Sequence, residues 1–402
     1  MAVPKLRFKE FDGDWSPYVL KDFVSFRKGK GISKADISEN GINECIRYGE
    51  LYTTYGQVID HIHSKTNVSK SECILSKAGD VIIPASGETQ IDIATASCVL
   101  HDDIILSGDL NILSHKENGS WLAYYLSSAK KLEIAQLAQG NSVVHLYSSQ
   151  LKDLKINKPS KEEQTKIASF LSNVDEKISQ LTQKHALLSQ YKQGMMQKLF
   201  SQQIRFKADD GSEFGEWENK TLGEVGENII GLTYSPTDVT NDSTGILVLR
   251  SSNIKEGRLD KSDQVRVNKK IKDKIIIQPN DILICTRNGS QRLIGKSVII
   301  NDDEIMTFGA FMSVYRSDYN RFIAYLMQTP WFFEQVQMNL GARINQITTG
   351  TLNEFTFDFP CLEEQTKIAN FLSAIDEKIE VVAQQIEQAK IWKKGLLQQM
   401  FV

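Results

Sequence analysis

The stretch PSKEEQTKIASFLSNVDEKISQLTQKHALLSQYKQGMMQKLF, residues 159–200, decides the fold because the chain contains it twice. The second copy, PCLEEQTKIANFLSAIDEKIEVVAQQIEQAKIWKKGLLQQMFV, occupies residues 360–402. The copies align without gaps and agree at about half of their positions, which indicates an internal duplication. The strongest block, EEQTKIA, starts at Glu162 in the first copy and at Glu363 in the second.

Apolar residues in each copy recur at alternating steps of about four and three, the pattern of a coiled-coil seam. Each copy has about 39 residues without an interior proline, which predicts a helix about 58 Å long. We expect the two helices to pack on each other as a coiled coil. The residues expected at this seam or against a partner subunit are Glu163, Gln164, Ile167, Leu171 and Ile178 in the first copy, and Glu364, Gln365, Ile368, Leu372 and Ile379 in the second.

The helix starts carry signals of their own. Ser160 and Glu163 have the spacing of a capping box, and glutamates in the first turn complement the helix dipole. The second copy has Cys361 in place of the serine, so its cap should be weaker. Gly194 and Gly395 recur at the same place inside the helices, where each costs about 1 kcal/mol relative to alanine. Recurrence of a costly residue suggests a close backbone approach or a bend.

The duplication extends beyond the helices. LRFK at residues 6–9 returns as IRFK at 204–207, GDVII at 79–83 as NDILI at 280–284, and WLAY at 121–124 as FIAY at 322–325. Each half is therefore one domain followed by one long helix. The predicted boundaries are 1–158 for the first domain, 159–200 for the first helix, 201–359 for the second domain and 360–402 for the second helix.

Within each domain, short strands and turns dominate. Residues 81–83 and 282–284 are brief apolar runs typical of buried strands, and residues 151–156 and 355–359 alternate as half-buried strands do. Residues 121–137 and 322–340 each look like one helix, the second interrupted by Pro330. The predicted fold class is α+β: two domains with curved, mainly antiparallel sheets, related by a pseudo-twofold internal repeat and separated by the two long helices.

Composition narrows the class of protein. With 41% hydrophobic and 24% charged residues, the 402-residue chain is ordinary for a soluble protein, and it has no apolar run of the length that a membrane span needs. The five cysteines are scattered without a C-x-x-C pair, which favours a reducing cytoplasm. A net charge of −3 argues against binding nucleic acid by bulk charge alone. If nucleic acid is the partner, the positive charge must be concentrated locally or supplied by other subunits.

No strong catalytic or metal motif is present. Gly289 followed by Gly295-Lys296-Ser297 has five residues between the glycines where a phosphate-binding loop has four. The pair in Asp60-His61-Ile62-His63 lacks further clustered ligands, so no metal site is expected. Lipase, zinc-protease and dinucleotide fingerprints are missing, as is an Asn-Pro-Pro-Tyr-type methyltransferase motif. We expect a chain with no catalytic residues, which binds and positions while others catalyse.

Polar loops at matching places in the two halves carry residue types that read base edges in DNA. The candidate DNA-binding residues in the first domain are Arg47, Tyr48, Ser86, Glu88, Thr89, Gln90, Asn141 and Ser142. Those in the second are Arg250, Ser252, Asn253, Arg287, Asn288, Ser290, Gln291, Arg292, Arg343, Asn345 and Gln346. Any single one of them is more often an ordinary solvated turn residue. Taken together as loops at matching places, however, they fit two domains that each recognise a different short DNA sequence.

The block EEQxKIAxFLSxxDEKI, at residues 162–178 and 363–379, resembles the specificity subunit of Type I restriction-modification systems. The resemblance covers the full chain and implies two target-recognition domains on double-stranded DNA, each reading one half of an asymmetric two-part site. It implies two modification subunits, which bring S-adenosylmethionine-dependent N6-adenine methylation, and two restriction subunits with ATP and Mg. It also implies that this chain binds no cofactor, and that its two long helices form an antiparallel coiled-coil pair that sets the unread gap.

Two other readings stay open at the level of sequence. A coiled-coil scaffold without DNA readout explains the helices but not two domains with divergent loops. A self-sufficient methyltransferase or nuclease is disfavoured by the missing motifs.

The expectation that the helices set the unread gap has a physical basis. A rigid helix pair holds two DNA-binding domains at a fixed separation, and major-groove segments on one face of DNA recur about every 34 Å.

Overall fold

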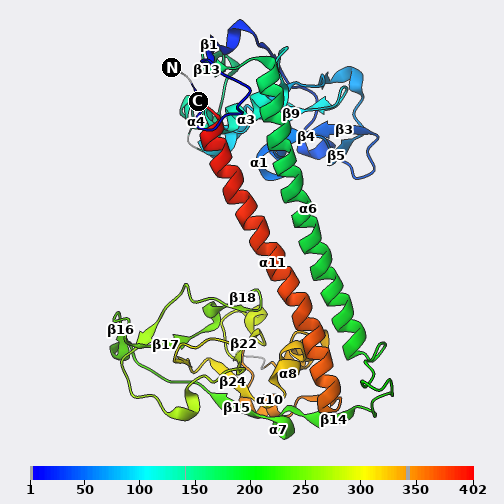
Figure 1. The fold of residues 1–402 in the computed structure, drawn as a ribbon, viewed down its shortest axis with the longest axis vertical. Helices are drawn as coiled ribbons and strands as arrows, with labels where there is room; N and C mark the ends of the chain where they lie inside the picture. The colour runs from blue at the N-terminus through cyan, green and yellow to red at the C-terminus, as the bar shows by residue number, and fades with distance from the viewer. Residues whose placement is uncertain (1–2, 141, 341–344) are drawn as a thin grey trace. The chain divides into compact units, whose positions relative to one another are not determined.

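The computed structural model describes residues 3–140, 142–340 and 345–402, which form two compact units. The first unit comprises Met1–Gln183 and Val382–Val402, and the second comprises Lys184–Val381. Two long helices, α6 (Lys161–Phe200) and α11 (Leu362–Met400), each contribute residues to both units (Figure 1). Their continuity over 40 and 39 residues agrees with the length that the sequence predicts.

The described residues of the first unit form four sheets. The five-stranded sheet has the spatial order β2 (Ser25–Lys28), β11 (Leu110–Ser114), β7 (Val81–Pro84), β9 (Ser97–Val99) and β4 (Val58–Ile59). The four-stranded sheet has the order β5 (Ser64–Thr66), β3 (Asn43–Ile46), β10 (Ile105–Leu106) and β6 (Ile74–Leu75). The two-stranded sheets pair β1 (Ser16–Val19) with β13 (Lys155–Lys158), and β12 (Val144–His145) with β8 (Ser86–Gly87). Among the described residues of this unit, only the β3–β10 and β4–β9 pairs are parallel. The helices are α1 (Glu50–Thr53), α2 (Gln90–Ile93), α3 (Gly119–Ser128), α4 (Lys131–Leu137) and α5 (Ser148–Leu151).

The second unit repeats this plan. One four-stranded sheet has the spatial order β15 (Glu227–Ile230), β24 (Met312–Arg316), β21 (Ile282–Cys285) and β22 (Ser297–Ile299). The other has the order β16 (Val239–Thr240), β20 (Arg266–Val267), β17 (Ile246–Leu249) and β23 (Met306–Phe308). The two-stranded sheets pair β14 (Glu218–Thr221) with β25 (Thr356–Phe359), and β18 (Ile254–Lys255) with β19 (Arg258–Leu259). The helices are α7 (Leu222–Val225), α8 (Asn320–Leu326), α9 (Pro330–Met338) and α10 (Thr349–Asn353). The prediction of two mainly antiparallel α+β domains is confirmed.

Two local predictions are wrong. Residues 121–137 form two helices, α3 and α4, because the backbone N–H of Lys130 bonds to the carbonyl of Tyr125 and ends the first helix. Residues 151–156 are not one strand, because α5 runs to Leu151 and β13 begins only at Lys155. Alternation of apolar and polar residues over so few positions does not separate a strand from a helical turn.

A buried glutamate ties each domain to the start of its long helix. Glu163 accepts two hydrogen bonds from the guanidinium of Arg7, both of 2.8 Å, and one of 3.4 Å from the indole N–H of Trp15. Its backbone N–H bonds to the hydroxyl of Ser160 (3.3 Å), as expected for the helix cap, while its carboxylate is committed to the domain. In the second unit Glu364 accepts from Arg205 (3.1 and 2.7 Å) and from Trp217 (3.0 Å).

The glutamines that follow these two glutamates also make hydrogen bonds at the start of each long helix. The side-chain amides of Gln164 and Gln365 donate to the carbonyls of Pro159 (3.1 Å) and Pro360 (2.8 Å). Both glutamines and both glutamates are buried within their own units. All four side chains therefore make contacts within their own unit, although Oε1 of Gln365 has no hydrogen-bond partner among the described residues. Their expected place at the seam or against a partner subunit stays a prediction.

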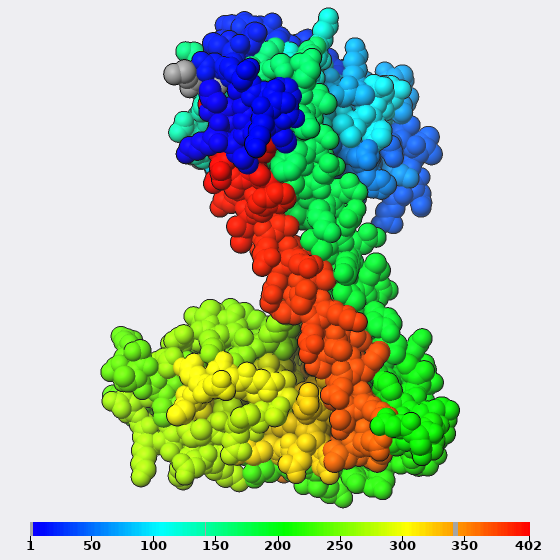
Figure 2. Space-filling model, in the orientation of Figure 1, coloured from blue at the N-terminus to red at the C-terminus, as the bar shows by residue number. Residues whose placement is uncertain are grey.

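Within each unit, the first half of one long helix packs against the second half of the other. In the first unit Ile167 and Leu171 share a core with Leu396 and Met400, and Ile178 packs beside it. In the second unit Ile368, Leu372 and Ile379 share a core with Met196 and Leu199. Figure 2 shows the C-terminal end of α11 (red) against the first residues of the chain (blue), where Leu6 N–H bonds to the Gln399 carbonyl (2.9 Å).

A repeated polar cluster also links the helices within each unit. Asp175 accepts from Tyr124 (2.7 Å) and pairs with Lys393 (2.5 Å). Asp376 likewise accepts from Tyr325 (2.9 Å) and pairs with Lys192 (2.8 Å). Burial and the adjacent carboxylate raise the pKa of both tyrosines, which keeps them neutral hydrogen-bond donors. Each unit therefore has the same lysine–aspartate–tyrosine contact between its two helical segments.

The recurring glycines have no crowded surroundings. A Cβ built on Gly194 or Gly395 meets no heavy atom within 4 Å. Within the described chain, no close approach therefore explains the two glycines, and the alternative of a bend stays a prediction. In the part of the chain that the structure describes, none of the helices combines the length and hydrophobicity needed to cross a bilayer.

Candidate nucleic-acid interface

A hollow of about 1230 Å³ opens in the second unit and is lined by loops that lie far apart in the sequence. We call it the loop hollow. Its lining residues are Leu232, Thr233, Tyr234, Pro236, Val239, Arg250, Ser251, Ser252, Asp263, Val265, Arg287, Asn288, Gly289, Gly309, Ala310, Phe311, Met312 and Asn345. Five predicted DNA-binding residues are among them: Arg250, Ser252, Arg287, Asn288 and Asn345. The fold thus brings together candidates from three separate loops.

Hydrogen bonds join these three loops to one another. The side-chain amide of Asn288 donates to the hydroxyl of Ser251 (2.9 Å), and its backbone N–H donates to the carbonyl of Asn345 (3.2 Å). Asn345 returns a bond from its own amide to the carbonyl of Gly289 (3.0 Å). Because each loop is bonded to the next, the candidate side chains are held at defined positions, which is what selective recognition requires.

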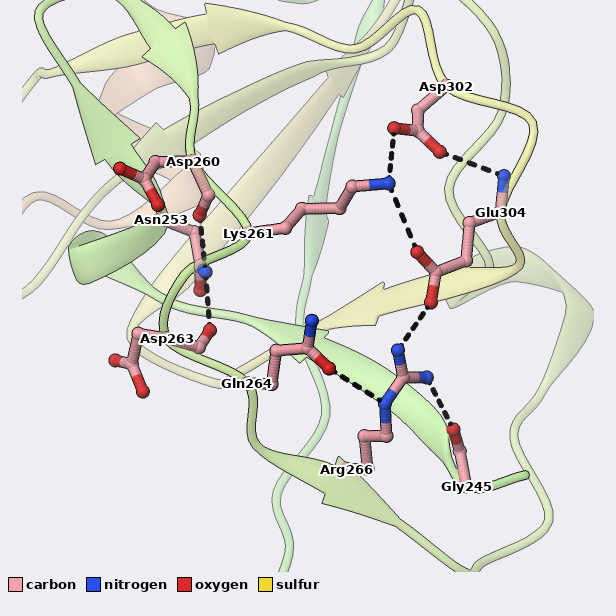
Figure 3. Close-up of polar contacts among 9 residues, drawn as sticks. All are labelled: Gly245, Asn253, Asp260, Lys261, Asp263, Gln264, Arg266, Asp302 and Glu304. Carbon is pink, nitrogen blue, oxygen red and sulfur yellow. Dashed lines mark hydrogen bonds and ion pairs between the residues drawn. The ribbon is translucent and has the colours of Figure 1, made fainter. Parts of the chain in front are cut away.

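Arg250 begins the first of these loops, directly after β17. Its guanidinium pairs with Asp263 (2.6 Å), and its backbone N–H donates to the side chain of Asn253 (2.9 Å). Asn253 in turn donates to the carbonyls of Asp260 and Asp263, both at 2.8 Å (Figure 3). Asn253 is fully buried with its donors and acceptor occupied, so it shapes the loop and does not offer a group to a base edge.

An ion-pair network fixes the segment that follows. Lys261 contacts Asp302 (2.7 Å) and Glu304 (3.2 Å), and Arg266 pairs with Glu304 (2.7 Å) (Figure 3). The bond from Arg266 holds the pKa of Glu304 below its usual range, and Lys261 does the same for the pKa of Asp302. Both carboxylates are therefore ionised at neutral pH, and the segment carrying Asp263 is anchored behind the loop hollow.

Arg287 is placed differently from Arg250. Its guanidinium carbon lies 4.8 Å from the centre of the Phe311 ring, a cation–π distance. Both side chains are exposed, Phe311 to 57%. Among the described residues the Arg287 guanidinium has no ion pair or hydrogen bond, so its donors are available. Sequence reasoning missed Phe311, because an apolar residue at the start of a strand gives no signal that it faces solvent.

Other candidates of the second domain lie beside the loop hollow. Gln291 donates to the side chain of Gln337 (2.9 Å), whereas Ser290 and Arg292 are exposed. Gln346 pairs through its backbone with Arg287. Arg343 lies outside the described residues. These positions remain predictions, since no ligand tests them.

In the first unit, Arg47 follows β3 as Arg250 follows β17. Its backbone N–H donates to Glu50 (2.8 Å), and its guanidinium pairs with the same carboxylate (2.8 Å). In both units, therefore, the side chain three residues after this arginine accepts a hydrogen bond from the arginine's backbone N–H and closes the loop. That side chain is Glu50 in the first unit and Asn253 in the second. Tyr48 is half-buried against the core formed around Ile46 and Leu51.

The remaining candidates of the first unit form a second loop group. Ser86 is buried in β8, where it pairs with His145 of β12, so its predicted contact with DNA does not fit its position. Thr89 caps α2, and the amide of Gln90 reaches the carbonyl of Ala138 (3.4 Å). Glu88 and Ser142 are exposed. Asn141 lies outside the described residues.

These features define a class of protein: a duplicated recognition protein, in which one fold carries two different sets of polar loops. The chain matches the family model described as Type I restriction modification DNA specificity domain over residues 12–190 and 215–390. The chain belongs to this Type I restriction-modification DNA specificity family.

Relatives of similar length agree. The chain is 25% identical to the Type I restriction enzyme MjaVIII specificity subunit of Methanocaldococcus jannaschii, over 97% of this chain and 94% of that protein. It is 29% identical to the putative Type I restriction enzyme MjaX specificity subunit of the same organism, over 98% and 94%. The crystal structure of a Type I restriction-modification S subunit from M. genitalium has the same fold, with a TM-score of 0.65 at 15% identity and coverage of 100% and 99%.

The protein is therefore a DNA specificity subunit, a non-catalytic component that works in a complex with other subunits of a Type I restriction-modification system. Its task is recognition of a DNA sequence, and the catalytic activities lie in partner subunits.

Proposed function

We propose that each unit reads one half of an asymmetric, two-part site on double-stranded DNA, and that the complex methylates or cleaves DNA accordingly. The observation that carries this proposal is the repetition of one fold with different loop residues. Arg47 and Arg250 keep the same place after equivalent strands, whereas Ser86 and Arg287, each two residues beyond β7 and β21, differ in charge and exposure. Equivalent loops with different donors and acceptors select different base pairs.

Repeated surface features support two copies of the modification subunit. Tyr191 on α6 and Trp392 on α11 occupy equivalent positions in the two copies of the repeat, and each is 52% exposed. Exposed aromatic residues on otherwise polar helices are typical of interaction sites. Two like surfaces on one chain suit two identical partners. Two restriction subunits complete the proposed assembly.

Cofactors in this proposal belong to the partners. S-adenosylmethionine is expected on the modification subunits, and ATP and Mg on the restriction subunits, with none on this chain. A net charge of −3 means that partner subunits supply much of the charge that neutralises DNA phosphates. Because the substrate is the cell's own and invading DNA, we place the complex in the cytoplasm.

The test is a single-molecule map of N6-methyladenine in cells that carry a cognate modification subunit, with and without this gene. The expected result is a new asymmetric motif of two short half-sites separated by a fixed gap, present only with the gene. A stable complex with the modification subunit that adds no motif, and that leaves no footprint on DNA, would instead favour a scaffold without DNA readout.

A further inference from the structure

Arg287 has no ion-pair partner among the described residues. Three of the described residues that line the loop hollow are charged, Arg250, Asp263 and Arg287, and the first two form an ion pair with each other. The side chain of Arg287 is exposed. An exposed arginine with no acceptor in the described chain is suited to an acceptor supplied by a ligand.

We propose that Arg287 reads a guanine in the half-site bound by the second unit, and that Phe311 positions it. This inference rests on the proposed function. The planar guanidinium presents two parallel N–H groups, which match the O6 and N7 acceptors on the major-groove edge of guanine. The cation–π contact with Phe311, at 4.8 Å from the ring centre, restricts the movement of that fork before DNA arrives, so less conformational entropy is lost on binding.

The backbone around this pair is fixed on both sides. The carbonyl of Phe311 accepts hydrogen bonds from the N–H groups of Arg287 (3.0 Å) and Thr286 (3.1 Å), and from the Thr286 hydroxyl (3.1 Å). On the other side, Arg287 forms a β-bridge with Gln346, and Ile347 N–H bonds to Thr286 (2.9 Å). A cation that only neutralises a phosphate needs no such fixed geometry, whereas bidentate reading of a base does.

The first unit has different residues at the same two positions. Ala85 N–H bonds to the carbonyl of Asp109 (2.7 Å), just as Thr286 N–H bonds to that of Phe311, so the strand register matches Asp109 to Phe311. The residue after Ala85 is Ser86, which is buried. The first unit therefore lacks an arginine stacked on an aromatic ring at this place, and loss of the Arg287 contact should alter only one half-site.

The experiment compares the intact chain carrying R287Q or R287K with wild type, each in complex with the modification subunit, by methylation mapping and DNA binding. We expect R287Q to remove the requirement for one G·C pair in one half-site, while the other half-site and the gap stay unchanged. Affinity for the original site should fall roughly 5- to 150-fold. R287K keeps the charge but loses the fork, so the same pair should become less selective.

Three further variants complete the set. F311L removes the ring face and should relax the same base pair, whereas F311Y keeps the ring and should retain the wild-type motif. Arg321 is exposed on α8, does not line the loop hollow and is not a candidate DNA-binding residue, so R321Q should leave the motif intact. Unchanged thermal unfolding and unchanged association with the modification subunit confirm that each variant is folded.

Two results would overturn the inference. An unchanged motif with weaker binding to every sequence, and a salt dependence reduced by about one ion, identifies Arg287 as a phosphate contact. An unchanged motif with unchanged affinity shows that Arg287 does not touch DNA. Both differ from failure of the proposed function, in which wild type itself produces no two-part motif.

Discussion

At the scale of single residues, a few buried charges organise the chain. Glu163 and Glu364 look like ordinary first-turn glutamates in the sequence, yet each is buried and accepts hydrogen bonds from an arginine and a tryptophan in the opening segment of its own domain. The carboxylate thus joins the opening of a domain to the helix that ends it. Removing one member of such a pair leaves the other charge buried and unpaired.

We predict that Glu364→Gln lowers the free energy of unfolding of the second unit by about 2–3 kcal/mol, somewhat less than for a fully buried pair because Arg205 keeps 20% side-chain exposure. Urea unfolding of the full chain, followed by tryptophan fluorescence, measures this loss. The matched control is Glu227→Gln, which breaks the exposed Lys274–Glu227 pair in the same unit and should cost about 0.5 kcal/mol or less. Equal losses in the two variants would refute the anchoring role of Glu364.

At the scale of elements, α6 and α11 are stabilised by packing and by contacts repeated at equivalent positions. Their seams are buried in the cores of the units, and the pairs Lys393–Asp175 and Lys192–Asp376 repeat the same link. The two interior glycines, Gly194 and Gly395, contribute neither to the buried seams nor to these ion pairs. With no neighbour within 4 Å, they cost conformational entropy without a compensating contact in this chain.

Gly194→Ala and Gly395→Ala should therefore each stabilise the chain by about 0.5–1 kcal/mol. Thermal or urea unfolding of the full chain measures the gain. Gly79→Ala provides the contrast, since Gly79 has open surroundings but a φ of +89°, so alanine there should destabilise. Stabilised helix variants that no longer bind the modification subunit would show that a partner approaches these glycines closely. Destabilisation by either helix variant would contradict the prediction.

At the scale of the whole molecule, the two compact units do not follow the order of the chain. Each unit contains one domain, the helix half that follows that domain, and the far half of the other helix. The boundary falls between Gln183 and Lys184 in α6 and between Val381 and Val382 in α11. The domain limits expected from the sequence stay a prediction, because they divide the chain by the repeat and not by its contacts.

Inserting four residues of helix-forming sequence at both boundaries, about one turn in each helix, should change the gap between half-sites and leave both half-sites intact. The reason is that the inserted turns lie outside the loops of either unit. Methylation mapping of the variant chain with its modification subunit measures the result. Paired alanine substitutions at Gln183 and Lys184, without insertion, form the control and should keep the original gap. Altered half-sites would count against independent readers.

The sequence by itself determined the duplication, the two long helices and the class of fold, because these depend on periodicity and local propensity that repeat along the chain. It also predicted Arg250, Arg287 and Asn345 as DNA-binding candidates on separate loops, and these three residues line the loop hollow. What it left undecided depends on distant contacts. Only the tertiary structure showed that the side chain of Asn253 is hydrogen-bonded inside its own loop. It also showed that Glu163 and Glu364 bond the start of each long helix to its domain, and that the Phe311 ring lies against the Arg287 guanidinium. Those outcomes depend on strand register and burial, which bring together residues whose separation in the sequence carries no signal.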